Sequence, residues 1–190
     1  MHSVWKTSIR FTLVTTVLLG LGYPLLVTGI AGVIFPRQAG GSLVHKDGLK
    51  NGPVIGSELL AQSFTSDRYF HPRPSANSYD AQNSGGSNLA QSSKTLVTRI
   101  QSDIDKLAAQ NPGKPVPIDL VTTSASGLDP DITPDAAKFQ APRVAKARNL
   151  SEETVLKLIE QHITKRQLGL LGEPRVNVLK LNHDLDKLAK

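Results

Sequence analysis

The sequence has no cysteine, few aromatic residues and no block of like charges, and each absence excludes a class of protein. Without cysteine there is neither a disulfide framework nor a thiolate set for zinc. Aromatic residues are 5% of the chain, and its 22 basic and 16 acidic residues are interspersed. A pI of about 9.7 therefore does not indicate a nucleic-acid-binding surface, which needs clustered cations and stacking rings.

Catalytic motifs are also missing. No Gly-x-Ser-x-Gly or GxxxxGK[ST] stretch occurs, which argues against a serine hydrolase and a P-loop nucleotidase. The adjacent acids Glu152-Glu153 are better explained as the first turn of a helix than as an acid–base pair. No helical metal-ligand spacing links the five histidines, His2, His45, His71, His162 and His183. We predict a chain with no catalytic residue and no metal site of its own.

One long run without charge stands out, at residues 11–35. As a helix it reaches roughly 37 Å, enough to cross a hydrocarbon core of about 30 Å, and we predict a transmembrane helix there. The alternative is a cleaved signal peptide ending near Gly29-Ile30-Ala31, which would release a free secreted domain. The run is about twice the length of a usual signal-peptide core, which favours a retained anchor.

Charges beside this run predict its orientation. Lys6 and Arg10 lie on the N-terminal side, so the positive-inside rule places residues 1–10 in the cytoplasm. Residues 36–190 then form an extracytoplasmic domain of a single-pass protein of the cell (inner) membrane. Arg37 and Lys46 oppose this orientation, because they lie close to the other end of the helix.

Small residues recur along the predicted helix at a spacing of four. Such positions are neighbours on a helix surface, and small side chains there let another membrane helix approach closely. We therefore expect partner helices within the lipid bilayer. The ridge consists of Thr12, Thr16, Gly20, Pro24, Thr28 and Gly32.

The remainder predicts one small mixed α+β domain. Apolar pairs at 43–44 and 54–55 flank turns at Asp47-Gly48 and Asn51-Gly52. Helices are expected at 56–64, 93–110, 134–148, from Ser151 to Lys165-Arg166, and at 184–189. Strands are expected at 116–122 and 175–181. The apolar face of the second helix comprises Leu96, Val97, Ile100, Ile104, Leu107 and Ala108.

A segment rich in Ser, Asn, Gly and Pro spans residues 65–93, a length that usually marks a functional or disordered loop. Within it, five residues could form a backbone nest for an anion, with Arg73 upstream and Arg99 downstream. The same pattern is more often only a turn. The five are Ser84, Gly85, Gly86, Ser87 and Asn88.

These segments together resemble the C subunit of Kdp-type potassium-transporting ATPases over nearly the whole chain. Ala90-Gln91 and Ala125 depart from the pattern, where Gly-Pro and a glycine are expected. The resemblance rests on the N-terminal helix and on residues 56–62, 64–65, 69–70, 73–76, 79, 84–89, 116–122, 126–130, 143–145, 162, 168–169 and 171–179.

This resemblance implies an accessory subunit of an ATP-driven potassium uptake complex. Its partners would be a channel-like potassium-binding subunit, a P-type ATPase catalytic subunit and a small membrane peptide. The family is described as a catalytic chaperone that aids assembly and raises ATP affinity, and nucleotide contact is linked to the loop at Ser84–Asn88.

The predicted membrane orientation conflicts with the description of nucleotide contact, because a domain outside the cytoplasmic membrane cannot meet cytoplasmic ATP. We expect indirect coupling through helix packing. The alternatives are direct ATP binding as a nucleotide-binding regulator, and a cap at the potassium entrance.

Overall fold

The computed structural model describes residues 2–46 and 52–188, and Asp47-Gly48 and Asn51 lie outside the described residues. The chain divides into two compact units, Met1–Leu43 and Val44–Lys190. Each unit is described by itself.

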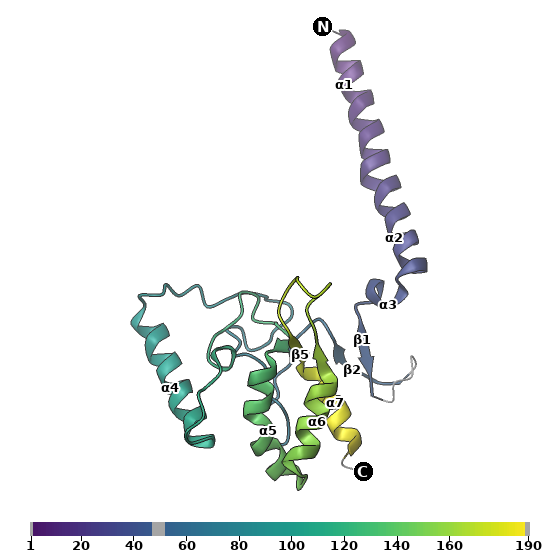
Figure 1. The fold of residues 1–190 in the computed structure, drawn as a ribbon. Coiled ribbons are helices and arrows are strands. Elements are labelled where there is room, and N and C mark those ends of the chain that lie inside the picture. Colours follow the sequence, from purple (N-terminus) through teal and green to yellow (C-terminus); the bar gives the residue numbers. More distant parts are fainter. Residues whose placement is uncertain (1, 47–51, 189–190) are drawn as a thin grey trace. The chain divides into compact units, whose positions relative to one another are not determined.

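The first unit is dominated by one continuous helix in three parts: α1 (His2–Thr15), the π-helical segment η1 (Thr16–Gly22) and α2 (Tyr23–Ile34) (Figure 1). Ser3–Ile34 is long and apolar enough to cross a membrane. The short helix α3 (Pro36–Ala39) follows.

Pro24 accounts for the π-helical segment. Proline has no N–H to donate to the carbonyl of Gly20, and its ring crowds that carbonyl. The turn before it widens instead, and the Tyr23 N–H donates to the carbonyl of Leu18, five residues back. Four residues exceed one α-helical turn but fall short of one π-helical turn. Residues spaced four apart therefore step around the helix axis in one direction along α1 and α2, and in the opposite direction along η1.

The second unit contains two small sheets. The strands β1 (Leu43–His45) and β2 (Val54–Ser57) pair with each other. The second sheet is antiparallel in the order β3-β5-β4, formed by β3 (Asp131–Ile132), β5 (Arg175–Asn177) and β4 (Ile163–Thr164). Val176 pairs with Ile132 on one side and Ile163 on the other.

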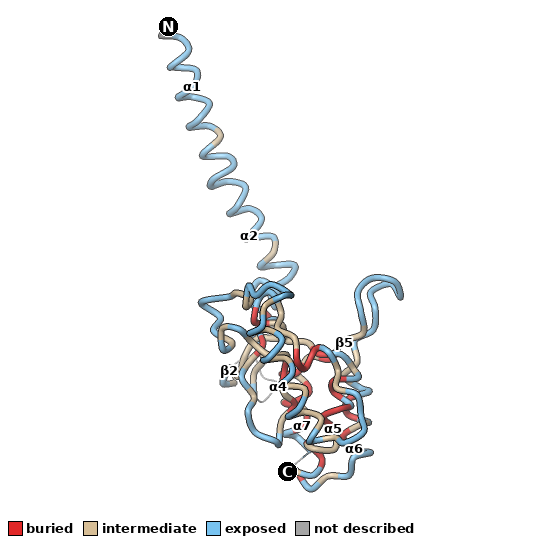
Figure 2. Tube along the Cα trace, turned by 90° about the vertical axis from the view of Figure 1, so that its left-hand side faces the viewer, coloured by how far each residue is buried: buried red, intermediate tan, exposed pale blue. Residues whose placement is uncertain are grey.

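Three helices, α5 (Pro134–Arg148), α6 (Glu152–His162) and α7 (Val178–Leu188), all contact β5. Buried residues concentrate along these helices (Figure 2). Four alanines on α5 are buried, and their small side chains let α6 pack closely. Side-chain oxygens cap both N-termini: Thr133 accepts from the Ala136 N–H (3.1 Å) and Ser151 from the Thr154 N–H (3.2 Å).

The helix α4 (Lys94–Gln110) lies at the margin, and none of its residues is buried. Leu107 packs against the core, whereas Val97, expected on the apolar face, is 58% exposed. Arg99 donates to Asp103 (3.0 Å) and to the carbonyl of Val121 (3.1 Å).

Side chains from α5 and α7 hold the irregular segment 58–93. Arg143 donates to the carbonyls of residues 67 (2.8 Å) and 69 (3.0 Å), and Arg148 to that of residue 68 (2.6 Å). Asn182 bonds both the N–H (2.8 Å) and the carbonyl (2.9 Å) of Phe70. Gln140 does the same for His71, at 2.8 and 3.1 Å. The carbonyls of five consecutive residues, 67–71, are thus held by side chains and not by a sheet ladder.

Several predicted elements differ in the structure. Residues 56–64 form no helix, because β2 continues to Ser57 and turns follow. Residues 116–122 are not a strand but a short 3-10 helix, η2 (Ile118–Leu120). Pro115 and Pro117 supply no N–H for a ladder, which disfavours a strand.

The C-terminal elements are also shifted. The helix α6 ends at His162, so Lys165-Arg166 lie beyond its last turn. The strand β5 is three residues long, and α7 begins at Val178 rather than at residue 184. Asn177 ends the strand by capping the helix, since its side-chain oxygen accepts from the Lys180 N–H (3.1 Å).

Candidate functional site

The glycine-rich loop, residues 84–88, lies against residues 124–127, about forty positions further along the chain. The Gly85 N–H and the Ser84 hydroxyl both donate to the carbonyl of Ser126, at 2.8 and 3.1 Å. The N–H groups of Ser84, Gly86, Ser87 and Asn88 have no partner among the described residues. The loop therefore offers four of the five backbone donors of a possible nest.

Packing explains two glycines at this contact. A Cβ on Gly86 would lie 3.1 Å from the Ala125 carbonyl oxygen. Gly127 has a φ of +68°, and a Cβ there would lie 2.4 Å from Asn77 Oδ1 and 2.8 Å from the Gly85 carbonyl oxygen. Gly85 itself faces open space. Close backbone approach thus requires glycine at 127 and favours it at 86, independently of any ligand.

Hydroxyl groups brace the loop from the preceding turn. The Ser75 hydroxyl lies 2.7 Å from the Gly127 carbonyl oxygen and accepts from the Tyr79 N–H (2.9 Å). The Tyr79 hydroxyl donates to the carbonyl of Arg73 (2.9 Å), and burial raises the pKa of Tyr79. These contacts give the loop a defined shape.

A hollow of about 630 Å³ adjoins the loop, and its two charged lining residues neutralise each other. Arg73 Nη1 lies 2.9 Å from Asp129 Oδ2, and the same guanidinium approaches Thr122 Oγ1 and the carbonyls of Thr122 and Thr123 (3.4 Å each). Arg99, the other expected cation, pairs with Asp103. The hollow therefore offers hydroxyls and carbonyls but no uncompensated positive charge.

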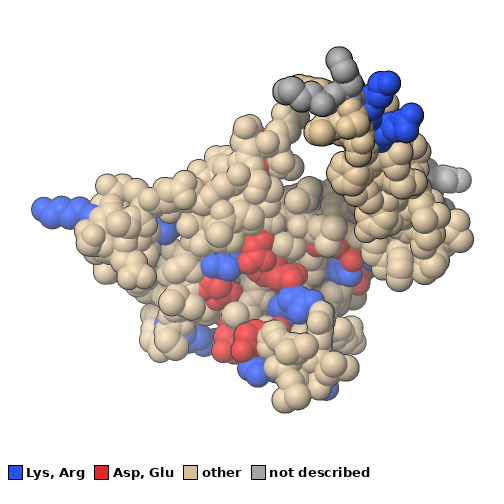
Figure 3. Space-filling view, turned by 90° about the horizontal axis from the view of Figure 1, so that it is seen from above, with Lys and Arg blue, Asp and Glu red and all other residues tan. Residues whose placement is uncertain are grey.

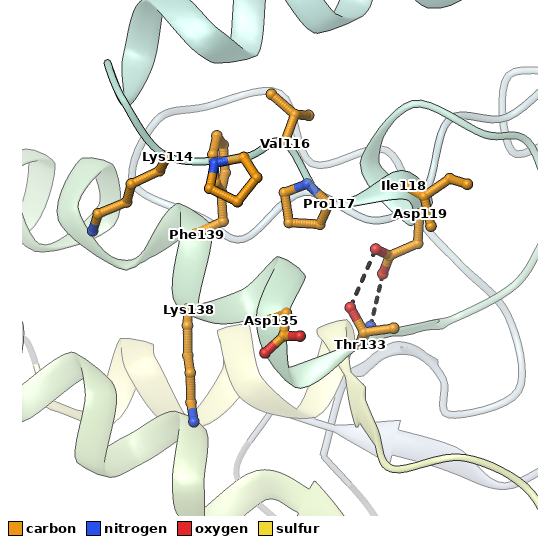
Figure 4. A pocket seen from close by; sticks show the side chains of 10 residues that line it. Lys114, Val116, Pro117, Ile118, Asp119, Thr133, Asp135, Lys138 and Phe139 are labelled. Atoms are coloured by element: carbon orange, nitrogen blue, oxygen red, sulfur yellow. Dashed lines mark hydrogen bonds between the residues drawn. The ribbon is translucent and has the colours of Figure 1, made fainter.

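A second hollow, of about 450 Å³, lies between η2 and the start of α5 (Figure 4). Asp119 and Thr133 point toward each other across it: Asp119 accepts from the Thr133 N–H (2.7 Å) and hydroxyl (3.2 Å). Lys138 pairs with Glu160 (2.6 Å). Asp119 thus anchors the residue that caps α5, which is a structural role.

Among the described residues, no group of three His, Cys, Asp or Glu side chains could hold a metal ion. His162 lies 3.1 Å from Asp184; burial lowers the pKa of His162, and Asp184 opposes the shift. Burial and Arg143 lower the pKa of His71. Charges of both signs interleave over the face of the body seen in Figure 3.

The expected packing ridge of the long helix is uncovered within the chain. All of its positions are exposed, and no atom lies within 4 Å of a Cβ built on Gly32. Thr16 and Gly20 lie in the π-helical segment η1. Because positions spaced four apart step in the opposite direction there, the small residues stay closer to one face of the helix than they would along a uniform α-helix. Exposed small residues here can admit another helix.

Sequence reasoning missed the residues that support the loop, Asn77, Ser126 and Gly127. The only local signal was the turn-forming pair Ser126-Gly127. Their contact with the loop is long-range, and no single-sequence pattern reports it.

Fold and surface together define a class: a small α+β domain carried by one N-terminal helix that is long and apolar enough to cross a membrane. A family model described as "K+-transporting ATPase, c chain" matches residues 5–187. The chain belongs to this family, the C subunits of potassium-transporting ATPases.

Curated relatives carry the description "Potassium-transporting ATPase KdpC subunit". The chain is 56% identical to that of Bradyrhizobium diazoefficiens over 198 residues, covering 97% of this chain and 96% of the relative. It is 55% identical to that of Methylobacterium nodulans (92% of each chain) and to that of Acidobacterium capsulatum (96% of this chain, 97% of the relative). These matches bear out the resemblance found in the sequence.

Proposed function

We propose that this chain is a non-catalytic accessory subunit that supports assembly of the pump and raises the ATP affinity of its catalytic subunit without holding ATP itself. Potassium is the cargo of the complex. The partners would be a channel-like potassium-binding subunit and a P-type catalytic subunit, with a small membrane peptide.

One observation supports the proposal that the chain acts without binding ATP: Arg73 forms an ion pair with Asp129 in the hollow beside the glycine-rich loop. A triphosphate needs several uncompensated cations or a helix N-terminus aimed at it. Arg73, the one cation among the described residues that line the hollow, is already neutralised, so ATP would gain little by binding.

The long helix supports the assembly role. Its uncovered small residues suit contact with a partner helix in the bilayer. With Lys6 and Arg10 on the cytoplasmic side, the domain would lie outside, and its effect on ATP would travel as a coupling free energy between two states of the pump.

Direct nucleotide contact is the second candidate, favoured by the unpartnered N–H groups of Gly86, Ser87 and Asn88. The two candidates differ in what the chain alone does with ATP.

The test combines two measurements. Removing the chain from the complex is expected to raise the KM for ATP, while the full-length chain in detergent, titrated calorimetrically with ATP, gives no saturable heat. Gly85→Val serves as the probe variant, because Gly85 faces open space and tolerates a side chain. Saturable ATP binding that disappears in Gly85→Val would establish direct contact and refute the indirect mode.

A further inference from the structure

The turn that joins β4 to β5 carries three leucines with almost no protein around them. Leu168, Leu170 and Leu171 are 92%, 80% and 60% exposed. No charged residue occurs between Gln167 and Gly172, which we call the leucine tip. Exposed apolar clusters of this kind mark contact surfaces.

Four backbone N–H groups of the leucine tip are hydrogen-bonded within the turn between β4 and β5. Gln167 and Leu171 exchange both N–H···O bonds, at 2.8 and 2.9 Å. The N–H groups of Gly169 and Leu170 donate to carbonyls within the same turn, at 3.2 and 3.1 Å. Paired backbone groups are what a segment needs to enter a medium without water, because unpaired ones are costly there.

Chain length brings this part of the domain toward a bilayer. Nine residue-to-residue steps lead from the end of the apolar helix, Ile34, to the first residue of β1, Leu43, and they span at most about 30 Å. Within the second unit, the leucine tip and β1 lie toward the same end (Figure 1). The connection from the apolar helix thus enters the second unit at the end that carries the tip.

Charge at the base of the tip suits a lipid surface. Residues 165–175 contain three basic residues and one acidic residue, a net charge of +2. Glu173 pairs with Arg166 (2.6 Å) and Arg175 pairs with Asp131 (3.0 Å), so Lys165 is the residue of this basic collar that has no ion pair among the described residues. Anionic headgroups attract that charge, while the leucines above it carry no polar side-chain group to satisfy.

We propose that the leucine tip inserts into the interfacial region of the bilayer that its own helix crosses, giving the domain a second attachment to the membrane. The inference rests on Ser3–Ile34 crossing a bilayer and not on how the chain affects ATP. Internal backbone pairing and the basic collar favour lipid over a protein pocket, because a protein pocket would require neither feature.

The test places a tryptophan at the tip of the full-length chain in phosphatidylcholine–phosphatidylglycerol vesicles. In a Trp5→Phe background, Leu170→Trp is compared with Glu153→Trp, whose parent side chain is 76% exposed in the first turn of α6, the end of that helix away from β4. We expect the emission of Leu170→Trp to shift to the blue and to fall about twofold with bromine-labelled acyl chains, with no change for Glu153→Trp.

The same measurement on the assembled complex completes the test. Emission typical of water for Leu170→Trp would overturn the proposal. A blue shift without quenching by bromine-labelled lipid would also overturn it, because the leucines would then be buried in protein, in a pocket of a partner subunit. Either result leaves the ATP measurements above unaffected.

Discussion

Asn182 lies 1% exposed on α7 and holds both backbone groups of Phe70, a fully buried residue. Asn182→Leu keeps a similar volume but leaves the Phe70 N–H and carbonyl buried without partners. Each unpaired group costs about 1–3 kcal/mol, so we expect a loss of about 2–6 kcal/mol. Domains of this size are stable by about 5–15 kcal/mol, so the loss would be a large share of the total.

Urea unfolding of the full-length chain in detergent, followed by circular dichroism, measures this loss. Gln161→Leu is the matched control, because Gln161 is exposed on α6 and its side chain has no hydrogen bond among the described residues. We expect the control to change stability by less than about 0.5 kcal/mol. A loss below about 1 kcal/mol for Asn182→Leu would refute the reasoning, since one unpaired group alone should exceed it.

Three further predictions concern pH, backbone shape and assembly. The folded pKa of His71 is lowered, first by burial and then by Arg143, so stability is complete above pH about 6.5 and falls as the pH drops below it. Thermal melts at pH 7.5 and 5.5 should show a smaller difference for His71→Gln than for the parent; equal differences would contradict this. Gly127→Ala should cost more in urea unfolding than Gly113→Ala, which has a similar positive φ of +81° but open space around it. Equal costs would mean that the contact with Asn77 is unimportant. Gly32→Leu should reduce recovery of the complex by affinity purification, whereas Gly29→Leu, off the ridge, should not; the reverse order would place the helix contact elsewhere.

Local signals predicted the helices whose starts are capped by the chain itself. Ser151 with the acids after it gave α6 its starting point, and Pro134 marked the start of α5, whose cap at Thr133 the structure adds. The periodic spacing of apolar residues predicted α4 but not its place at the margin of the domain. Periodicity shows that a helix has an apolar face, and not which part of the protein covers that face.

Two strands were predicted wrongly, because the residues in them are also compatible with another structure. Asn177 sits in an alternating apolar stretch, and that pattern predicted a strand to residue 181. Its side chain instead caps a helix at Val178, and α7 then buries Leu181 and Leu185 on one face. Residues 116–122 have apolar strand-forming residues, but Pro115 and Pro117 cannot join a ladder.

The candidate site was half visible in the sequence. Composition singled out residues 84–88, whereas the carbonyl of Ser126 and the close approach at Gly127 depend on a contact across about forty residues. The Arg73–Asp129 pair, which removes the free cation from the hollow, is separated by 56 positions and was equally hidden.

Pinning the segment 67–71 by side chains has a consequence for the order of folding. Its bonds to residues 140, 143, 148 and 182 close loops of 69 to 112 residues, so they cannot form until α5 and α7 are in place. This segment is therefore expected to order last and to open first. In hydrogen exchange its amides should form one cooperative unit of lower protection than α5 and α6.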